Sequence, residues 1–182
     1  MKNYTDQFQQ YWAQFSHQLN LEKSRSEQLF TLLSKSYTES QRYYHTIQHI
    51  VECLELFDQV KKKLNDPSAV ELAIWFHDVI YDPQASDNEE QSAELMKNTC
   101  VGILNTVQLD KVYDWIIATK KHQPAKDQDL NYLLDIDLAI LGSGSERFTE
   151  YEQQIQQEYS WVEPELYQVK RAEVLQLSLI HI

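Results

Sequence analysis

Apolar residues recur every three to four positions along most of this chain, which is the spacing of one face of an α-helix. The first such stripe runs through Phe8, Tyr11, Trp12, Phe15 and Leu19. It predicts a helix over about 4–19, and the same pattern predicts helices around 29–37 and over about 47–64. No segment of the sequence alternates apolar and polar residues with the two-residue period of a strand.

Capping and breaking residues divide the rest of the chain into further helices. Asp66-Pro67 combines an N-cap residue with proline at the first helical position, so a helix is predicted from 67 to about 80. Two Ser-x-x-Glu patterns, at Ser86 and Ser143, are typical of capping boxes that open helices. The remaining predicted helices cover about 107–121, 132–141 and 146–159, with a last one from 164.

Length and composition agree with these helices. The 182 residues suffice for one sizeable core, and only three glycines and four prolines argue against a turn-rich β-fold. No linker, repeat or low-complexity tract interrupts the chain. We therefore predict an all-α fold in a single domain over residues 1–182.

Net charge and cysteine content restrict the partners and the cellular compartment that we expect for this protein. The formal net charge is −12, and such an acidic surface repels phosphate backbones, which argues against binding DNA or RNA. The N-terminus is polar and no apolar stretch approaches the length of a membrane span, so no membrane partner is expected. Cys53 and Cys100 are too few for a disulfide framework, and we predict two reduced cysteines in a cytoplasmic protein.

The most informative residues are His77 and Asp78, which lie inside the apolar run 73–81. Burying an unpaired charge is so unfavourable that buried ionisable groups are normally paired or bound to a metal. Further candidate ligands are His45, His49, Asp135 and Asp137. Imidazole and carboxylate groups suit Mn²⁺, Fe²⁺, Co²⁺, Ni²⁺ or Zn²⁺, and Mg²⁺ is also acceptable.

These residues stand in an order that resembles the HD-domain superfamily of metal-dependent phosphohydrolases. The likeness is closest to a group of small predicted HD phosphohydrolases and covers about 37–171. The matching motifs are Arg42-Tyr43-Tyr44-His45-Thr46-Ile47-Gln48-His49, Trp75-Phe76-His77-Asp78-Val79-Ile80-Tyr81-Asp82, Ser86-Asp87-Asn88-Glu89-Glu90-Gln91-Ser92-Ala93, Thr119-Lys120-Lys121-His122, Asp135-Ile136-Asp137-Leu138-Ala139-Ile140-Leu141-Gly142, Glu158-Tyr159 and Arg171. The resemblance implies a single HD-domain helical bundle. It also implies a metal-dependent phosphohydrolase acting on a nucleotide, a nucleoside phosphate or another small phosphate ester.

The resemblance further implies a set of metal ligands. They are His45, His77, Asp78 and Asp137. His49, one helical turn after His45, is then expected beside the site as a substrate contact, although two histidines four apart can also share a metal. Asp135 and Asp137 point about 200° apart on a helix, so only one of them can be a ligand. Asp137 matches the family motif, and Asp135 is the alternative.

Other residues are expected to act on the substrate. Asp78 and Asp82 are the predicted catalytic carboxylates. The stretch ending at Asp82 resembles HD enzymes that hydrolyse guanosine tetraphosphate with a Glu-Asp pair. Here Tyr81 stands in place of that Glu, which counts against the same activity and leaves Asp82 to position the attacking water. Lys120 and His122 lie where a predicted helix ends before Pro124 and are expected to contact substrate phosphate at the mouth of the cleft.

Two other functions stay open from the sequence. A regulatory protein can keep the metal site without catalysis, and a di-iron HD-type oxygenase can use extra histidines such as His49 and His122 to hold a second metal. A homodimer is compatible with either function. Two departures from the family pattern also stand out. Gln156 replaces a usual arginine, and 179–182 stands where relatives continue with an arginine and an Ile-Tyr pair, so His181 is not expected in the site.

Overall fold

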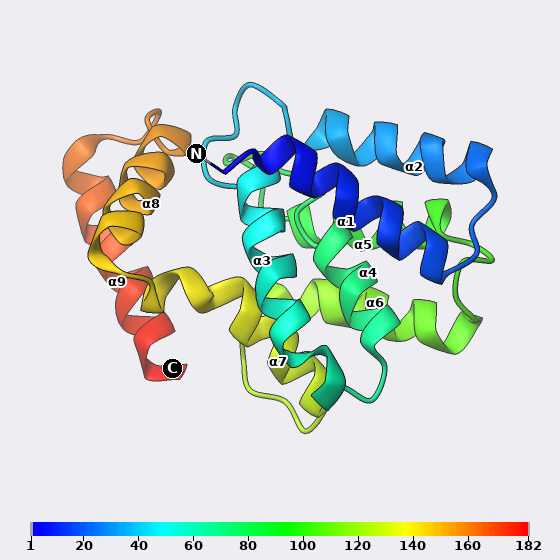
Figure 1. Cartoon of the computed structure of the whole chain (residues 1–182). Coiled ribbons are helices and arrows are strands. Elements are labelled where there is room, and N and C mark those ends of the chain that lie inside the picture. The colour runs from blue at the N-terminus through cyan, green and yellow to red at the C-terminus, as the bar shows by residue number, and fades with distance from the viewer. Residues whose placement is uncertain (1, 182) are drawn as a thin grey trace.

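The computed structural model describes the backbone of residues 2–181 and the side chains of residues 2–176, so the prediction for His181 concerns a side chain outside the described residues. The described chain is all-helical, as the periodicity predicted (Figure 1). Its α-helices are α1 (Tyr4–Gln18), α2 (Lys23–Ser36), α3 (Ile47–Val60), α4 (Pro67–Phe76), α5 (Asn88–Thr99), α6 (Thr106–Thr119), α7 (Gln128–Asp137), α8 (Ser145–Glu158) and α9 (Pro164–His181). Two 3-10 segments are η1 (Lys61–Lys63) and η2 (Leu138–Gly142).

Helix α4 lies at the centre of the fold, and its last eight residues are all buried. It begins as predicted, because the Asp66 side chain accepts the backbone N–H of Ala69 at 3.3 Å. The helix ends at Phe76, four residues earlier than predicted. His77 is therefore its C-terminal cap and Asp78 lies in the turn beyond, so the two side chains are free of the 100° separation of an ideal helix.

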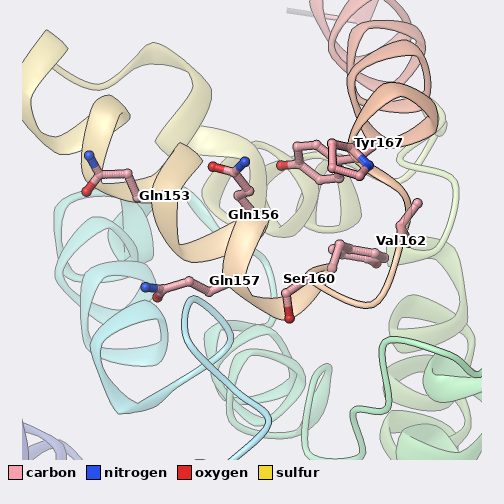
Figure 2. Close-up of a pocket in the computed structure, with 8 residues that line it drawn as sticks. Gln153, Gln156, Gln157, Ser160, Val162 and Tyr167 are labelled. Atoms are coloured by element: carbon pink, nitrogen blue, oxygen red, sulfur yellow. The ribbon is translucent and has the colours of Figure 1, made fainter.

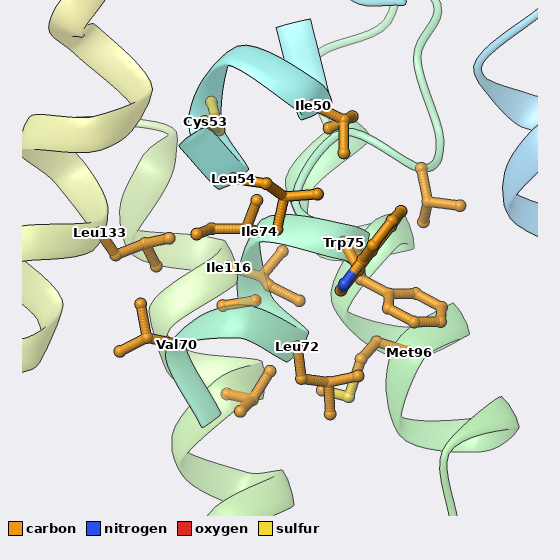
Figure 3. Packing of buried hydrophobic residues seen from close by; sticks show 14 of the residues in the cluster. Ile50, Cys53, Leu54, Val70, Leu72, Ile74, Trp75, Met96, Ile116 and Leu133 are labelled. Atoms are coloured by element: carbon orange, nitrogen blue, oxygen red, sulfur yellow. The ribbon is translucent and has the colours of Figure 1, made fainter. Parts of the chain in front are cut away.

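The core is built around this helix from several neighbours. Trp75 of α4 packs edge-on against Phe8 and Trp12 of α1, with ring centroids 4.9 and 5.3 Å apart. Side chains of α3, α5, α6 and α7 cover the other faces of α4 (Figure 3). Each large apolar side chain buried in this way contributes roughly 1.5–3 kcal/mol. The packing fixes the C-terminal end of α4, and with it His77.

Helices α8 and α9 stand to one side of the bundle and are joined to it through η2 (Figure 1). A second apolar cluster, formed by Tyr44, Tyr151 and Ile155, ties α8 to the segment that precedes α3. The rings of Tyr44 and Tyr151 meet edge-on with centroids 4.6 Å apart. The arrangement holds α8 beside the loop that carries His45.

Several predicted helix boundaries were wrong. Neither Ser-x-x-Glu pattern forms a capping box, and the helices begin at Asn88 and Ser145, two residues beyond the two serines and without a side-chain cap. The capping box of this fold lies at Asn105 and Gln108, at the start of α6. The long third helix stops at Val60 and continues as η1. Short polar patterns mark the neighbourhood of a helix start better than the starting residue itself.

Two predictions from composition bear on the environment of the chain. Cys53 and Cys100 are free thiols and both are buried, as predicted. Among the described helices, none combines the length and the hydrophobicity that crossing a membrane requires.

Candidate metal centre

Two histidines and two aspartates converge at one point of the fold. The residues are His49, His77, Asp78 and Asp137, and each offers one donor atom within 4.8 Å of all the others. His49 Nε2 and His77 Nε2 are 3.1 Å apart, and each lies 3.1–3.5 Å from Asp78 Oδ2 and from Asp137 Oδ1. Ligand atoms about 2.1 Å from one ion stand about 3.0–3.4 Å apart in octahedral or tetrahedral geometry. The observed spacings therefore fit a single metal ion.

Three of the donors lie at helix ends, and Asp78 lies in the turn after α4. His49 lies in the first turn of α3, His77 caps α4, and Asp137 is the last residue of α7. The Nδ1 atom of His77 is 2.9 Å from the carbonyl oxygen of Ile74, which can only accept a hydrogen bond. Nδ1 therefore carries the proton, and Nε2 presents its lone pair to the cluster when the ring is neutral.

His49 is oriented by a thiol and an aromatic ring. Its Nδ1 atom lies 3.7 Å from Cys53 Sγ, one helical turn further along α3. The ring of Tyr44 lies against the imidazole with centroids 4.8 Å apart. His49 is only 2% exposed, so these contacts leave its Nε2 atom facing the cluster.

Asp137 links the cluster to His122. Its Oδ1 atom faces the cluster, while Oδ2 lies 2.8 Å from His122 Nε2. His122 adopts a left-handed backbone conformation with φ +47° just after α6 ends, a position that usually favours glycine. Such strain of about 1–3 kcal/mol persists where the surroundings hold the residue in place. The sequence predicted a substrate contact for His122, and the structure shows that its partner is Asp137.

The electrostatics of the cluster favour a cation. Burial acts to raise the pKa of Asp78 and of Asp137, but the neighbouring imidazoles, that of His77 above all, outweigh burial and hold both values below the ordinary range. Burial likewise acts to lower the pKa of His77, and these carboxylates raise it well above its ordinary value instead. The site thus carries two buried negative charges, which a divalent ion neutralises.

The structure places His49, and not His45, in the cluster. His45 was predicted as a ligand, but it lies outside the four-residue cluster. Its Nδ1 atom is instead 2.7 Å from Glu158 Oε2, and its ring stacks on Tyr81 with centroids 4.2 Å apart. Helix α3 begins at Ile47, so His45 precedes the helix and does not share the helical face of His49.

Glu158 contacts the loop that carries His45, and the sequence predicted no role for it. It is 3% exposed, and its Oε1 atom accepts the backbone N–H groups of Tyr43, Tyr44 and His45 at 2.8–3.0 Å. Its Oε2 atom accepts the Tyr81 hydroxyl at 2.8 Å. Burial acts to raise the pKa of Glu158, but His45 and the N–H donors lower it to about 2. The residue therefore stays ionised and holds His45 in place.

A local signal for Glu158 does exist in the sequence. On α8 it follows Tyr151 and Ile155 at intervals of four and three residues, so a carboxylate occupies the apolar face of an amphipathic helix. Such a carboxylate must find donors elsewhere in the fold. The sequence could not predict which donors these are, because they lie more than 110 residues away along the chain.

Arg42 holds the two loops of the site together. Its guanidinium is buried and donates to the backbone carbonyls of His45 at 3.1 Å, Asp78 at 2.7 Å and Val79 at 3.0 Å. These bonds join the loop before α3 to the turn after α4. Arg42 belongs to the first sequence motif, although the sequence gives no sign of its partners.

The other predicted site residues have mixed outcomes. Asp82 is exposed, its carboxylate accepts the backbone N–H of Gln84 at 2.9 Å, and it does not line the cavity above the cluster, so its role with water stays a prediction from the sequence. Lys120 lines that cavity as expected, but its ammonium contacts Glu90 at 2.7 Å. Asp135 is exposed and lies outside the cluster, which leaves Asp137 as the converging aspartate.

Two cavities lie near α8 and α9. The larger, of about 780 Å³, opens above the cluster and is lined by Asp78, Asp137, His45, Lys120 and His122 among others. A smaller one, of about 440 Å³, lies at the α8–α9 junction beside Gln153, Gln156, Gln157 and Tyr167 (Figure 2). None of the described residues that line the smaller cavity is a His, Cys, Asp or Glu, whereas Asp78 and Asp137 of the cluster line the larger one.

Comparison with models of protein families, with curated proteins and with solved structures found no match for this chain. The resemblance to HD-domain phosphohydrolases therefore stays a prediction from the sequence. Independently of that resemblance, the geometry shows a buried His/Asp cluster that can bind a metal ion.

Proposed function

We propose that this protein is a metal-dependent phosphohydrolase that acts on a small phosphate ester. The observation that carries the proposal is the convergence of His49, His77, Asp78 and Asp137 beneath a cavity large enough for a substrate. Two imidazole nitrogens and two carboxylate oxygens are a donor set for Mn²⁺, Fe²⁺, Co²⁺, Ni²⁺ or Zn²⁺. Mg²⁺ prefers oxygen ligands and suits this set less well.

A divalent ion bound here supplies a Lewis acid that ionises water near neutral pH and polarises a phosphoryl oxygen. The residues of the chain orient the substrate. His45 lines the cavity, and ionised Glu158 accepts its Nδ1–H, so Nε2 is the ring atom available to a ligand. Burial acts to lower the pKa of His45, but Glu158 and Asp78 raise it, which keeps a proton on Nε2 to donate to a phosphoryl or leaving-group oxygen.

His122 and Lys120 have different parts in this proposal. His122 contacts the outer oxygen of Asp137 and so orients a ligand through its carboxylate. Lys120 can contact a phosphate only by leaving Glu89 and Glu90, which lie 3.8 and 2.7 Å from its ammonium. The principal phosphate contact is therefore assigned to His45.

A matched pair of substitutions tests the assignment. His49→Ala should lose bound metal, because it removes a donor from the cluster. His45→Gln, four residues away, should keep the metal and lose turnover by about 10²-fold or more, the usual scale for a proton donor. Metal content per chain and kcat at saturating Mn²⁺ are the two measurements. The reverse pattern would restore His45 as the ligand.

Activity itself is tested by a phosphatase screen with added Mn²⁺, Co²⁺ or Ni²⁺. Hydrolysis should be abolished by chelator and restored by the ion. A fully metallated protein that hydrolyses no nucleotide, nucleoside phosphate or other phosphate ester would refute the proposal. That result would favour a metal-binding regulatory protein.

One observation favours a second candidate. His122 already contacts the oxygen of Asp137 that faces away from the cluster, so the two residues can share a further ion. A stoichiometry of two irons per chain together with dioxygen consumption would indicate the di-iron oxygenase. One metal per chain with phosphatase activity excludes it.

A further inference from the structure

The cavity above the cluster is larger than a phosphate group requires. Its volume of about 780 Å³ falls in the range of about 300–1,000 Å³ that accommodates drug-sized ligands. Asp78, Asp137 and His45 occupy one side of it. The remaining space extends along η2, α8 and the beginning of α9, and it leaves room for an organic group attached to the phosphate.

The side chains along that extension are mainly aliphatic and aromatic. Examples are Ile140 and Leu141 of η2, Ile155 of α8, Trp161 in the turn between α8 and α9, and Leu166 in the first turn of α9. Trp161 is 53% exposed and Leu166 is 52% exposed, so both still have apolar surface to bury against a ligand. Exposed apolar surface that continues from a polar site indicates ligand binding.

The cationic side chains that line the cavity are already paired. The pairs are Lys120 with Glu90 at 2.7 Å, Lys170 with Glu173 at 2.9 Å, and Arg171 with Glu152 at 2.5 Å. The described lining therefore has no Lys or Arg without a carboxylate partner to receive a second anionic group. The net charge of −12 adds repulsion against polyanions.

We propose that the substrate is a phosphate monoester whose organic group is neutral and apolar, either alkyl or aryl, and that Trp161 contacts that group. This inference rests on the proposed function and narrows it. The single phosphate lies at the cluster beside His45, and the organic group lies along the wall formed by η2, α8 and the start of α9. Nucleoside diphosphates and triphosphates are disfavoured, because each Lys or Arg of the described lining already contacts a carboxylate that competes with their additional charge.

Two phosphonates distinguish the contribution of the head group to affinity from that of the organic tail. Octylphosphonate and methylphosphonate share one head group, and their P–C bond is not hydrolysed. Burying several methylenes against the wall should make octylphosphonate bind to the Mn²⁺-loaded protein at least about tenfold tighter. Trp161 reports binding directly, since Trp12, Trp75 and Trp115 are at most 4% exposed. Octylphosphonate should therefore protect the exposed fluorescence from acrylamide quenching.

Two substitutions test whether Trp161 contacts the organic group. Trp161→Ala changes an exposed residue, so the protein should fold, and the preference for octylphosphonate should fall by about fivefold to tenfold. Val107→Ala is the matched control, because Val107 is 75% exposed on α6 and does not line the cavity. Its affinities should equal those of the unchanged protein. A loss of preference in the control, or none in Trp161→Ala, would overturn the role of Trp161.

Hydrolysis measurements keep this inference separate from the proposed function. The kcat/KM for octyl phosphate should exceed those for glycerol phosphate and for adenosine diphosphate by at least about tenfold. Equal rates, together with equal phosphonate affinities, would overturn the substrate class while leaving the phosphohydrolase intact. Preferential octylphosphonate binding without hydrolysis of any ester would instead keep the ligand class and refute the proposed function.

Discussion

Replacing Glu158 by glutamine tests how strongly the site is held together. Glu158→Gln keeps the size of the side chain and one oxygen to accept the N–H groups of 43–45. It removes the charge beside His45 and turns an amide donor toward the Tyr81 hydroxyl and His45 Nδ1, which are themselves donors. The lowering of the Glu158 pKa from 4.5 to about 2 corresponds to about 3 kcal/mol of stability at neutral pH.

The same pKa shift sets the pH window of the effect. Because the folded pKa of Glu158 is depressed, its contribution is fully present above about pH 4.5 and declines as the pH falls toward 2. At pH 3 less than half of this stability, about 1 kcal/mol, should remain. His45 stays protonated in both states below about pH 5.5, because its ordinary pKa is 6.5 and folding raises it further. Changes in this window therefore belong to Glu158.

Urea unfolding of the metal-free proteins, followed by circular dichroism, measures the effect. The free energies of unfolding of the unchanged protein and of Glu158→Gln should differ by about 3 kcal/mol at pH 5.5 and converge toward pH 3. A difference that stays constant across this range would refute the reasoning, because it would show that the charge of Glu158 adds nothing beyond shape. Unequal urea m-values would point to a changed denatured state instead.

Four further predictions concern the rest of the site. Arg42→Lys should lower the free energy of unfolding by more than about 2 kcal/mol, measured with urea, because one ammonium cannot reach all three carbonyls. Cys53→Ala should weaken metal binding about tenfold in competition with a chelator, since His49 Nδ1 loses its contact. Asp82→Asn should keep kcat and metal content within about twofold of the unchanged protein, because Asp82 lies outside the cavity. A larger loss of kcat would support the role of Asp82 in positioning water. Mn²⁺ affinity, measured by calorimetry, should fall as the pH falls, since protons compete for His77, whose pKa is raised.

Local patterns were sufficient to predict the helices and one half of the cluster. The apolar period predicted the all-helical fold, and Asp66-Pro67 predicted the start of α4. The burial of His77 and Asp78 in an apolar run was a sound reason to expect a metal or an ion pair, and both lie in the cluster. In these cases the physical cause lies within a few neighbouring residues.

Roles that depend on distant partners could not be predicted in the same way. The exchange of His45 and His49 follows from where α3 begins and from Glu158, which is 113 residues away from His45. The carboxylate of Asp82 likewise turns to the backbone of Gln84 in the segment after α4. His45 and Asp82 were both predicted from family motifs, and both lie outside the helices, where backbone geometry is set by tertiary contacts.

The cluster lies at helix ends, and this position favours the binding of a cation. Helices α4 and α7 both end at the cluster, and the C-terminal end of a helix carries partial negative charge. Asp78 and Asp137 add two carboxylates at the same place, where burial limits screening by solvent. Without an ion, protonation of His77 compensates part of this charge. A divalent cation compensates all of it while leaving both imidazole lone pairs free to bind, so metal binding and the stability of this end of the fold are coupled.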